Sequence, residues 1–362
     1  MKLTSLSTVI FSLILAGCAS KNSAAPAPEA PVPAQAATPA PAKAGFLQAP
    51  TKTTLAAQGR NPAEFPAYVE QLKAKARQQG VDESTLESAF ANVHFVDHVI
   101  NSDRNQLEQK VTLSDYLSRV MTEKKIQQGR ESLQRYQAQL MPIAQRSGVQ
   151  PQYIVALWAM ESSFGKIQGR EDVISALATL AFEGRREAFF TKELFAALQI
   201  IQQQHIAAEE MKGSWAGAMG QNQFMPSSFM RYGADGDGDG KIDIWNSVDD
   251  VFASTANYLA KEGWKPGESW GREVILPVDF VPEMAGLKEG QSKTVGEWEK
   301  LGIRLNSDQQ LPDTHQRAWI VTPDDIPGRA FMVYDNFRTI MRWNRSYYFA
   351  ISIGMMADAI SQ

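Results

Sequence analysis

One carboxylate in this chain lies on the apolar face of a predicted helix. Residues 151–165 have the pattern of a helix, with Pro at the first position and Gly at the end. Glu161 shares one helix face with three apolar residues that precede it by seven, four and three positions, which are Ile154, Leu157 and Trp158. A carboxyl group removed from water keeps its proton to higher pH, as a general acid for glycosidic bond cleavage must near neutral pH. The alternative is a Glu at the edge of the apolar stripe, paired with Lys or Arg.

A second segment, residues 213–226, has the composition of a sugar-binding loop. Its Gly and Ala residues allow a ligand to approach the backbone closely. Neutral hydrogen-bonding groups and flat aromatic faces lie among them, namely Ser214, Gln221, Asn222, Gln223, Trp215 and Phe224. Neutral amides beside aromatic rings suit a sugar, although Gly and Ala runs also mark tight helix packing.

Together these segments carry a family resemblance. Residues 161–165, 213–220 and 223–228, in this order, resemble the membrane-bound lytic murein transglycosylase B family. Residues 235–245 and 342–350 extend the resemblance to nearly everything after residue 60. It implies a lysozyme-like core with a helical region and a small β domain. It also implies cleavage of cell-wall glycan between N-acetylmuramic acid and N-acetylglucosamine without water, which leaves 1,6-anhydromuramic ends.

The resemblance implies that Glu161 is the single catalytic acid and base. It would protonate the leaving oxygen, then take the proton of the sugar's own 6-hydroxyl as that oxygen closes on C1. The lack of an evident second carboxylate motif fits this expectation, because ordinary hydrolysis uses a pair. Glu171, Asp172 and Glu183 are close in sequence and remain open as second carboxylates. A hydrolytic muramidase and a non-catalytic glycan-binding lipoprotein are the alternatives.

Substrate contacts are also implied by the resemblance. Ser214 and Gln223 match residues that hydrogen-bond the substrate near the catalytic acid. Tyr258 and Asn344 match polar positions in the same groove. We therefore expect these four side chains to lie around one ligand.

Further contacts would come from aromatic and cationic residues. Tyr116 and Phe224 are expected as apolar walls for sugar rings, with plain core packing as the alternative. Arg186, beside Arg185, could meet acidic stem peptides or merely solvate a helix start.

Three positions depart from the family pattern. Asn222 stands where many relatives have Pro or Gly, and we expect it to loosen the turn before Gln223. Trp343 and Phe349 stand where some relatives have Tyr, which puts a hydroxyl contact at either position in doubt.

Residues 235–246 follow the pattern of an EF-hand calcium loop, with Gly at the sixth position for the sharp turn. The last ligand position holds an Asn rather than a Glu, so affinity should be modest, at roughly 0.1 to 1 mM. We expect a structural Ca²⁺ that braces the site, and no cofactor for the chemistry. An acidic turn without metal is the alternative. The candidate ligands are Asp235, Asp237, Asp239, the carbonyl of Lys241, Asp243 and Asn246.

Composition narrows the classes of partner. A formal charge of −4, with no basic stripe, argues against nucleic acid. His94 and His98 stand four apart, yet no third ligand is evident, so surface or hydrogen-bonded histidines are expected. His205 and His315 belong to no recognisable nucleophile motif. Peptidoglycan strands are the expected partner, and proteins of cell-wall synthesis or hydrolysis are possible further ones.

The start of the chain predicts export and anchoring. Residues 1–17 combine Lys2 with an apolar run too short to span a bilayer, as in a signal peptide. The segment 15–18 resembles a lipobox, and Cys18, the only cysteine, would become a lipidated first residue. A chance Cys in an ordinary signal is the alternative. Ala19, where inner-membrane retention would show Asp, implies an outer membrane lipoprotein that faces the periplasm of a Gram-negative bacterium.

The elements that must position these residues are mostly helical. Helical patterns are expected at 65–79, 84–91, 114–147, 173–182, 185–210, 248–262, 294–301 and 336–360, and strands at 272–277, 317–322 and 329–334. The expected fold class is mainly α (α+β). After an Ala/Pro-rich tether over 18–55, which could reach roughly 100 Å, we expect four parts. These are a helical domain (56–145), a lysozyme-like catalytic core (146–265), a small antiparallel β domain (266–334) and C-terminal helices that close on the core (335–362).

Overall fold

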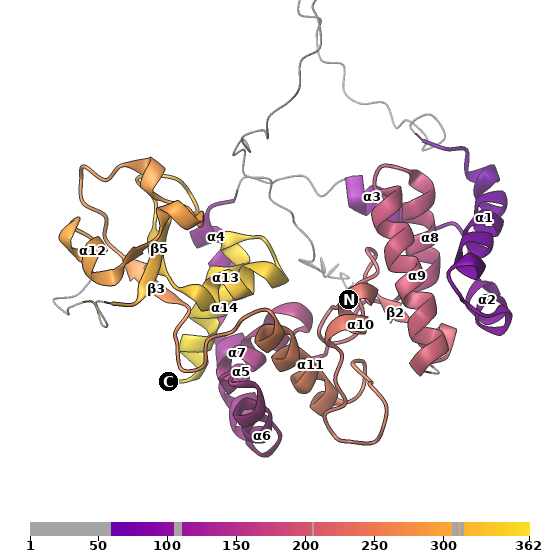
Figure 1. The fold of residues 1–362 in the computed structure, drawn as a ribbon, viewed down its shortest axis with the longest axis horizontal. Coiled ribbons are helices and arrows are strands. Elements are labelled where there is room, and N and C mark those ends of the chain that lie inside the picture. Colours follow the sequence, from indigo (N-terminus) through magenta and orange to yellow (C-terminus); the bar gives the residue numbers. More distant parts are fainter. Residues whose placement is uncertain (1–58, 105–110, 205, 306–310, 312–314) are drawn as a thin grey trace, which may run out of the picture.

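Helices dominate the part of the chain that the computed structural model describes, which is residues 59–104, 111–204, 206–305, 311 and 315–362 (Figure 1). Two small antiparallel sheets accompany them. The expected signal peptide, Cys18 and the tether lie outside the described residues. Within the described ranges, no helix is both long and apolar enough to cross a membrane. The mainly α fold class with a small antiparallel β part is confirmed.

Five helices pack together at one end of the molecule (Figure 1). Aromatic side chains hold this group: the Phe182 ring meets Phe65 and Phe95 edge-on at 5.5 and 6.0 Å. The predicted helix at 185–210 is shorter than expected, and a 3-10 turn, η3 (Ala208–Glu210), follows it. The helix at residues 97–104 was not predicted, because its sequence is largely polar. A short 3-10 turn, η2 (Pro62–Glu64), leads into the five helices, which are α1 (Phe65–Gln78), α2 (Glu83–Phe90), α3 (Asp97–Arg104), α8 (Val173–Glu183) and α9 (Glu187–Gln204).

The prediction of one helix over 114–147 is wrong, since three helices occupy this segment. Met121 leaves the helical conformation, and the Thr122 side chain accepts a hydrogen bond from the backbone N–H of Lys125, which starts a new helix. Tyr136 forms the second break. The helices are α4 (Leu113–Val120), α5 (Glu123–Arg135) and α6 (Gln137–Ser147).

The central helix is α7 (Pro151–Ser162), whose residues 153–159 are all buried. It packs against α5, α6, α11 (Val248–Lys261) and α14 (Tyr347–Ile360). The expected final helix is also divided: α13 (Asp335–Trp343) ends before Asn344, and the Ser346 side chain caps the start of α14. The helix α10 (Pro226–Tyr232) was not predicted. The C-terminal residues therefore close on the helix that carries Glu161.

A four-stranded sheet lies at the other end of the molecule from α1 and α2 (Figure 1). The three predicted strands are present in shortened form, and a fourth was missed. The sheet has its own small core around Trp298, Ile320 and Met332. Its order is β3 (Gly271–Val274), β6 (Ala330–Val333), β5 (Arg317–Val321) and β4 (Lys293–Thr294), with α12 (Val295–Lys300) after β4. Two 3-10 turns, η4 (Pro282–Met284) and η5 (Glu289–Gln291), join β3 to β4.

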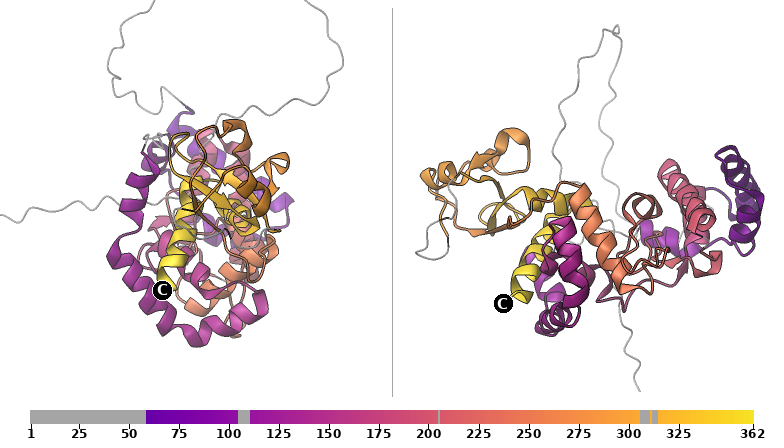
Figure 2. Two further views of the ribbon diagram at one scale, coloured as in Figure 1. Left: turned by 90° about the vertical axis from the view of Figure 1, so that its left-hand side faces the viewer. Right: turned by 60° about the horizontal axis from the view of Figure 1, so that its bottom comes forward.

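The packing places α7, the helix that carries Glu161, between the two ends of the molecule (Figure 2). Helices α5 and α6 pack on α7, although the sequence grouped them with the first helical part. Conversely, α8 and α9 pack with α1, α2 and α3. The second sheet, β1 (Glu171–Asp172) and β2 (Lys212–Gly213), joins the start of α8 to the loop at 213–226. The domain limits inferred from the sequence remain a proposal.

Candidate active site

Glu161 lies in the last turn of α7, where the backbone changes direction sharply. The helix ends at Ser162 rather than at Gly165, and the next three residues, 163–165, have φ angles of +49°, +60° and +77°. The turn is held by hydrogen bonds from the Phe164 N–H to the Trp158 carbonyl (3.2 Å) and from the Gly165 N–H to the Ser162 hydroxyl (3.0 Å). Left-handed conformations at non-Gly residues are costly, and they cluster at functional sites.

The Glu161 carboxyl is paired with an indole and not with a cation. Its side chain is partly buried, and the indole N–H of Trp343 donates a hydrogen bond of 2.7 Å to Oε1. Burial raises the pKa of Glu161 to about 8, against the opposing effect of the Trp343 hydrogen bond. Among the described residues, no Lys or Arg forms an ion pair with it. The expectation of a desolvated carboxyl therefore holds over the salt-bridged alternative.

Trp343 is the residue that sequence reasoning missed, since it was noted only as a departure from Tyr. It ends α13, and its ring lies 4.6 Å from the Tyr258 ring and 5.2 Å from the Phe224 ring. Tyr232 extends the cluster, 4.3 Å from Tyr258. Two expected substrate residues, Phe224 and Tyr258, are thus brought next to the carboxyl through the indole.

The loop that holds Ser214 and Gln223 is folded back on itself by short antiparallel bridges. The Ser214 hydroxyl accepts hydrogen bonds from the backbone of this loop, the closest from Ala218 N–H at 3.1 Å. Gln223 has φ +53°, and its amide donates to the carbonyls of Gly220 (2.7 Å) and Gln168 (2.9 Å). Both expected hydrogen-bonding residues are therefore built rigidly into the loop.

Gln221 and Asn222 hold this loop against the helices. The Trp158 indole N–H donates to the Gln221 side-chain oxygen at 2.7 Å. The Asn222 amide donates to the Val251 carbonyl (2.8 Å) and the Thr255 hydroxyl (2.7 Å) on α11. The expectation that Asn222 loosens the turn is wrong, because these two hydrogen bonds pin it.

The remaining expected contact residues have structural partners of their own. Asn344 caps the end of α13, directly after Trp343. Tyr116 is buried, with its ring 5.6 Å from Tyr348. The Arg186 guanidinium lies 4.4 Å from the Phe189 ring and 3.8 Å from the Asp103 carboxylate, and it remains partly exposed. These contacts within the protein account for the positions of the three side chains, whether or not they also contact a ligand.

The carboxylates that sequence left open as second catalytic groups are engaged elsewhere. Glu183 pairs with Arg104 at 2.6 Å, and Asp172 caps the start of α8. Glu171 lies 3.0 Å from His98. His94 contacts the Asn92 carbonyl at 2.9 Å through its ring nitrogen. The expectation of hydrogen-bonded histidines is confirmed for this pair, and His205 lies outside the described residues.

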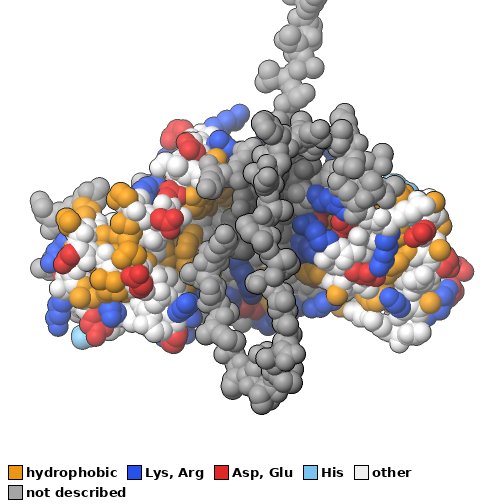
Figure 3. Space-filling view, turned by 90° about the horizontal axis from the view of Figure 1, so that it is seen from above, with side chains coloured by type: hydrophobic (Ala, Val, Ile, Leu, Met, Phe, Trp, Pro, Cys, Tyr) orange, Lys and Arg blue, Asp and Glu red, His pale blue; other side chains and the backbone are white. Residues whose placement is uncertain are grey.

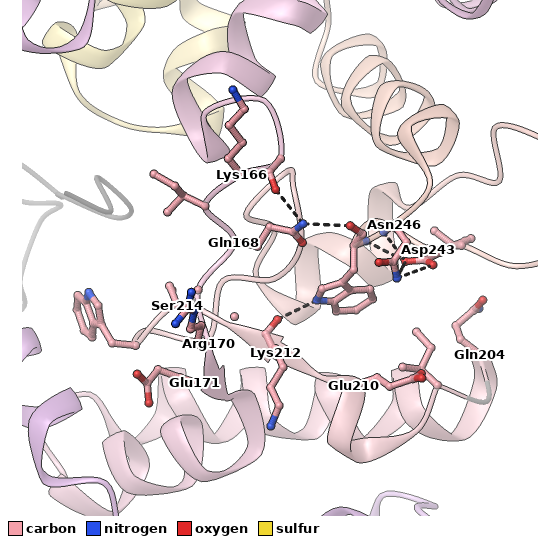
Figure 4. Close-up of a pocket in the computed structure, with 18 of the residues that line it drawn as sticks. Lys166, Gln168, Arg170, Glu171, Gln204, Glu210, Lys212, Ser214, Asp243 and Asn246 are labelled. Carbon is pink, nitrogen blue, oxygen red and sulfur yellow. Dashed lines mark hydrogen bonds between the residues drawn. The ribbon is translucent and has the colours of Figure 1, made fainter. Parts of the chain in front are cut away.

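A cavity of about 1190 Å³ opens between the turn after α7, the β1–β2 pair and the loop at 240–246, and Glu161 is not among the residues that line it. Figure 4 shows Lys166, Arg170 and Lys212 around it, together with Ser214. Acidic side chains at 171, 210 and 243 line it as well. Lys and Arg side chains also gather on the edge of the helical end that faces the middle of the molecule (Figure 3). Anionic and hydroxyl groups of a ligand would both find partners here.

The loop at 235–246 brings acidic groups together, and one of them was not among the expected ligands. Oxygens of Asp235, Asp237 and Asp250 lie within 4.8 Å of one another. Asp250 is buried in the first turn of α11, and burial together with the nearby Asp237 and Asp235 raises its pKa. Three carboxylates held this close fit a divalent cation, which would neutralise them.

The other expected ligands make local hydrogen bonds within the loop. Asp239 accepts from the Lys241 N–H at 2.8 Å. Asp243 accepts from the backbone N–H of Asn246 at 2.9 Å, and from the Asn246 side-chain amide at 3.0 Å.

Comparisons with known proteins match this arrangement over most of the chain. The transglycosylase SLT domain model matches residues 64–358. Membrane-bound lytic murein transglycosylase B of Escherichia coli (strain K12) is 28% identical over 360 residues, which is 96% of this chain and 95% of the relative. SltB3 from Pseudomonas aeruginosa, solved in complex with NAG-anhNAM-pentapeptide, superposes with a TM-score of 0.78 at 38% identity, over 82% of this chain and 79% of that one. Escherichia coli Slt35 in complex with calcium gives 0.70 at 28% identity, over 83% and 93%.

Proposed function

This chain belongs to the transglycosylase SLT domain family and is a lytic transglycosylase of peptidoglycan with a lysozyme-like fold, and we propose that Glu161 is its single catalytic acid and base. The observation that carries the proposal is the Glu161 carboxyl itself, whose pKa is raised to about 8 by burial. At neutral pH such a group is mostly protonated, so it can donate a proton to a leaving group.

The chemistry then needs one carboxyl and no water. Glu161 protonates the oxygen that links muramic acid to the next sugar, and the C1–O bond breaks. The 6-hydroxyl of the muramic acid attacks C1, and its proton passes to the Glu161 carboxylate. A 1,6-anhydro ring forms, and the acid is restored. The engagement of Glu171, Asp172 and Glu183 in other contacts supports a single carboxyl.

Substrate contacts are proposed for five further residues. Phe224 and Tyr258 would support sugar rings, because both pack on the indole that touches Glu161. Ser214 borders the cavity beside the turn after α7 and would meet sugar hydroxyls, as would Gln223 in the same loop. Asn344 adjoins Trp343 at the end of α13 and would add a polar contact.

Acidic parts of the substrate would meet the cationic side of the site. The solved SltB3 complexes contain NAG-anhNAM-pentapeptide and NAG-NAM-pentapeptide, whose peptides carry carboxylates. Arg186, partly exposed, and the cations Lys166 and Arg170 at the cavity are candidates to bind such peptides. Tyr116 on α4 would form an apolar wall.

Calcium is proposed as a brace. The three clustered carboxylates Asp235, Asp237 and Asp250 connect the loop to α11, the helix that carries Tyr258. Calcium would supply charge neutralisation there and fix the start of α11 relative to the loop. The Slt35 structure in complex with calcium supports this proposal.

An outer membrane lipoprotein is the proposed form in the cell. The lipobox-like sequence before Cys18 supports lipidation, and the relative from Escherichia coli is named as membrane-bound. Anchoring at Cys18, followed by the tether, would let the enzyme reach the cell wall from the periplasmic face of the membrane.

Digestion of purified sacculi tests the role of Glu161. The products should be muropeptides one water lighter than hydrolysis products, without reducing muramic ends, as measured by mass spectrometry. Glu161→Gln should release almost none, while Glu87→Gln, which alters an exposed carboxylate on α2, should keep most activity. Reducing muramic ends from the wild type, or equal release by Glu161→Gln, would contradict the proposal.

A further inference from the structure

In the hydrogen bond between Trp343 and Glu161, the indole can act only as the donor and the carboxyl oxygen only as the acceptor. An indole N–H is a donor and has no acceptor atom in the ring plane. Glu161 Oε1, at 2.7 Å from Trp343 Nε1, must therefore accept the hydrogen bond in both protonation states of the carboxyl. If the acid proton were on Oε1, the indole would donate to a hydroxyl oxygen, which is a weaker acceptor than a carbonyl oxygen, so this contact favours the proton on Oε2.

Packing holds the indole in this orientation. Its ring packs against Tyr258 at 4.6 Å and Phe224 at 5.2 Å, which also contact each other, and α13 ends at Trp343 itself. Tyr258 is in turn packed against Tyr232 at 4.3 Å. Rotation of the indole away from Glu161 would disturb this whole aromatic cluster, so the donor stays aimed at Oε1.

We propose that Trp343 is a positioning residue that confines the acid proton of Glu161 to Oε2. This inference rests on the proposed role of Glu161 as catalytic acid and base. In the first step Oε2–H gives its proton to the glycosidic oxygen. In the second step the same Oε2 takes the proton of the 6-hydroxyl, while Oε1 remains bound to the indole throughout. One oxygen thus does both proton transfers, and the carboxyl does not need to rotate between them.

The same bond supports the carboxylate that exists between the two steps. Hydrogen bonds to an ionised acceptor are shorter and stronger than neutral ones, so the indole stabilises Glu161 most when the proton has left. Burial has the opposite effect, because it favours the protonated carboxyl and raises the pKa of Glu161. The titratable group packed directly against the indole is Tyr258, and burial raises its pKa as well, so it stays neutral throughout the working range.

Nuclear magnetic resonance of the full chain labelled with ¹⁵N-tryptophan tests the proposal. Eight indole signals are expected, and Trp343→Phe identifies one of them by its loss. That signal should shift in a single step near pH 8, the pKa of Glu161. It should stay protected from exchange with water at pH about 5, where the carboxyl is protonated. In Glu161→Gln the step should vanish. Rapid exchange of the Trp343 indole N–H with water at low pH would overturn the proposal. So would an indole signal whose pH dependence is the same in the wild type and in Glu161→Gln.

Kinetics supply a second, independent readout. Trp343→Phe keeps an aromatic ring but removes the donor, so kcat should fall about tenfold or more with little change in KM. The basic limb of the pH profile of kcat should move to higher pH in Trp343→Phe, because the Glu161 carboxylate loses a hydrogen-bond donor and the pKa of Glu161 rises. Trp343→Tyr, which restores a donor, should recover part of kcat. An unchanged pH profile in Trp343→Phe would contradict the inference.

The outcomes separate this inference from the proposed function. An active Glu161→Gln variant would refute the catalytic role of Glu161, whatever the indole signal does. An inactive Glu161→Gln variant, together with a wild-type Trp343 signal that does not shift near pH 8, would refute only the role of Trp343. If Trp343→Phe does not fold, the comparison of wild type with Glu161→Gln still decides, with selective assignment of the indole by its contact with Tyr258.

Discussion

The indole N–H of Trp158 donates a hydrogen bond to the side-chain oxygen of Gln221, one helical turn before Glu161. The Gln221 amide nitrogen also donates to the Trp245 carbonyl at 2.9 Å, and its backbone N–H donates to the Ile244 carbonyl at 2.8 Å. A single glutamine therefore connects α7, the loop at 213–226 and the acidic loop at 235–246.

Removal of this glutamine should cost stability. Gln221→Met leaves the Trp158 N–H buried without an acceptor, and the free energy of unfolding should fall by about 1–3 kcal/mol. Urea denaturation measures it. Trp158→Phe combined with Gln221→Met should cost less than the sum of the two single changes, because neither partner is then left alone. Gln127→Met, on the exposed surface of α5, is the control. Strictly additive losses would contradict the direct bond.

The raised pKa of Glu161 should make stability depend on pH. The folded protein holds this proton up to about pH 8, whereas the unfolded chain releases it near the ordinary value of 4.5. Between these values the folded state binds more protons, so stability falls as pH rises. Glu161→Gln removes that loss, and its melting temperature should exceed that of the wild type by about 2 °C or more at pH 8. At pH 4.5 the two should agree. If the melting temperatures of the two proteins followed parallel curves from pH 4.5 to pH 8, the pKa of Glu161 would not be raised in the folded state.

Calcium should raise the melting temperature through Asp250. At about 10 mM calcium and the expected affinity, binding adds about 1.4–2.7 kcal/mol, or roughly 3 °C or more. Asp250→Asn and the exposed Asp237→Asn should each abolish most of this shift. Asp249→Asn lies beside Asp250 but outside the cluster, and it should keep the shift. A thermal scan with calcium and with chelator gives the measurement, and no shift in the wild type would count against the site.

Lipidation can be tested at Cys18 and Ala19. The wild type should incorporate labelled fatty acid, and Cys18→Ala should incorporate none, because no other cysteine exists. Ala19→Asp should keep the lipid but move the protein to the inner membrane in a density gradient. An unlabelled wild type would support an ordinary signal peptide.

The position of Glu161 could be predicted because a helix face is a local property of the sequence. Ile154, Leu157 and Trp158 are buried as expected, but so are all residues from 153 to 159, so the buried surface of α7 is wider than the predicted face. Its hydrogen-bond partner could not be predicted in this way, since Trp343 lies 182 residues further on and meets Glu161 only through the path of the whole chain. A tryptophan with a donor N–H, at a position where relatives have Tyr, was the available signal.

Two further errors have physical causes. The segment 114–147 keeps a polar face throughout, so its periodicity hid the breaks, although Thr122 before Glu123 is a typical helix start. Asp250 was not expected as a ligand, because it lies outside the segment 235–246, and its backbone N–H bonds to the Ser247 hydroxyl. Its carboxylate instead turns toward the acidic loop, which only the fold of that loop could reveal.

The closure of α13 and α14 on α7 also sets the order in which the site can be completed. Residues 1–334 contain Glu161, the substrate loop and the acidic cluster, while Trp343 and the helix that covers α7 come from residues 335–362. A chain that ends before residue 335 therefore has the Glu161 carboxyl without the indole that donates to it. The surroundings of Glu161 are complete only when α13 and α14 have packed against each other and α14 has packed on α7.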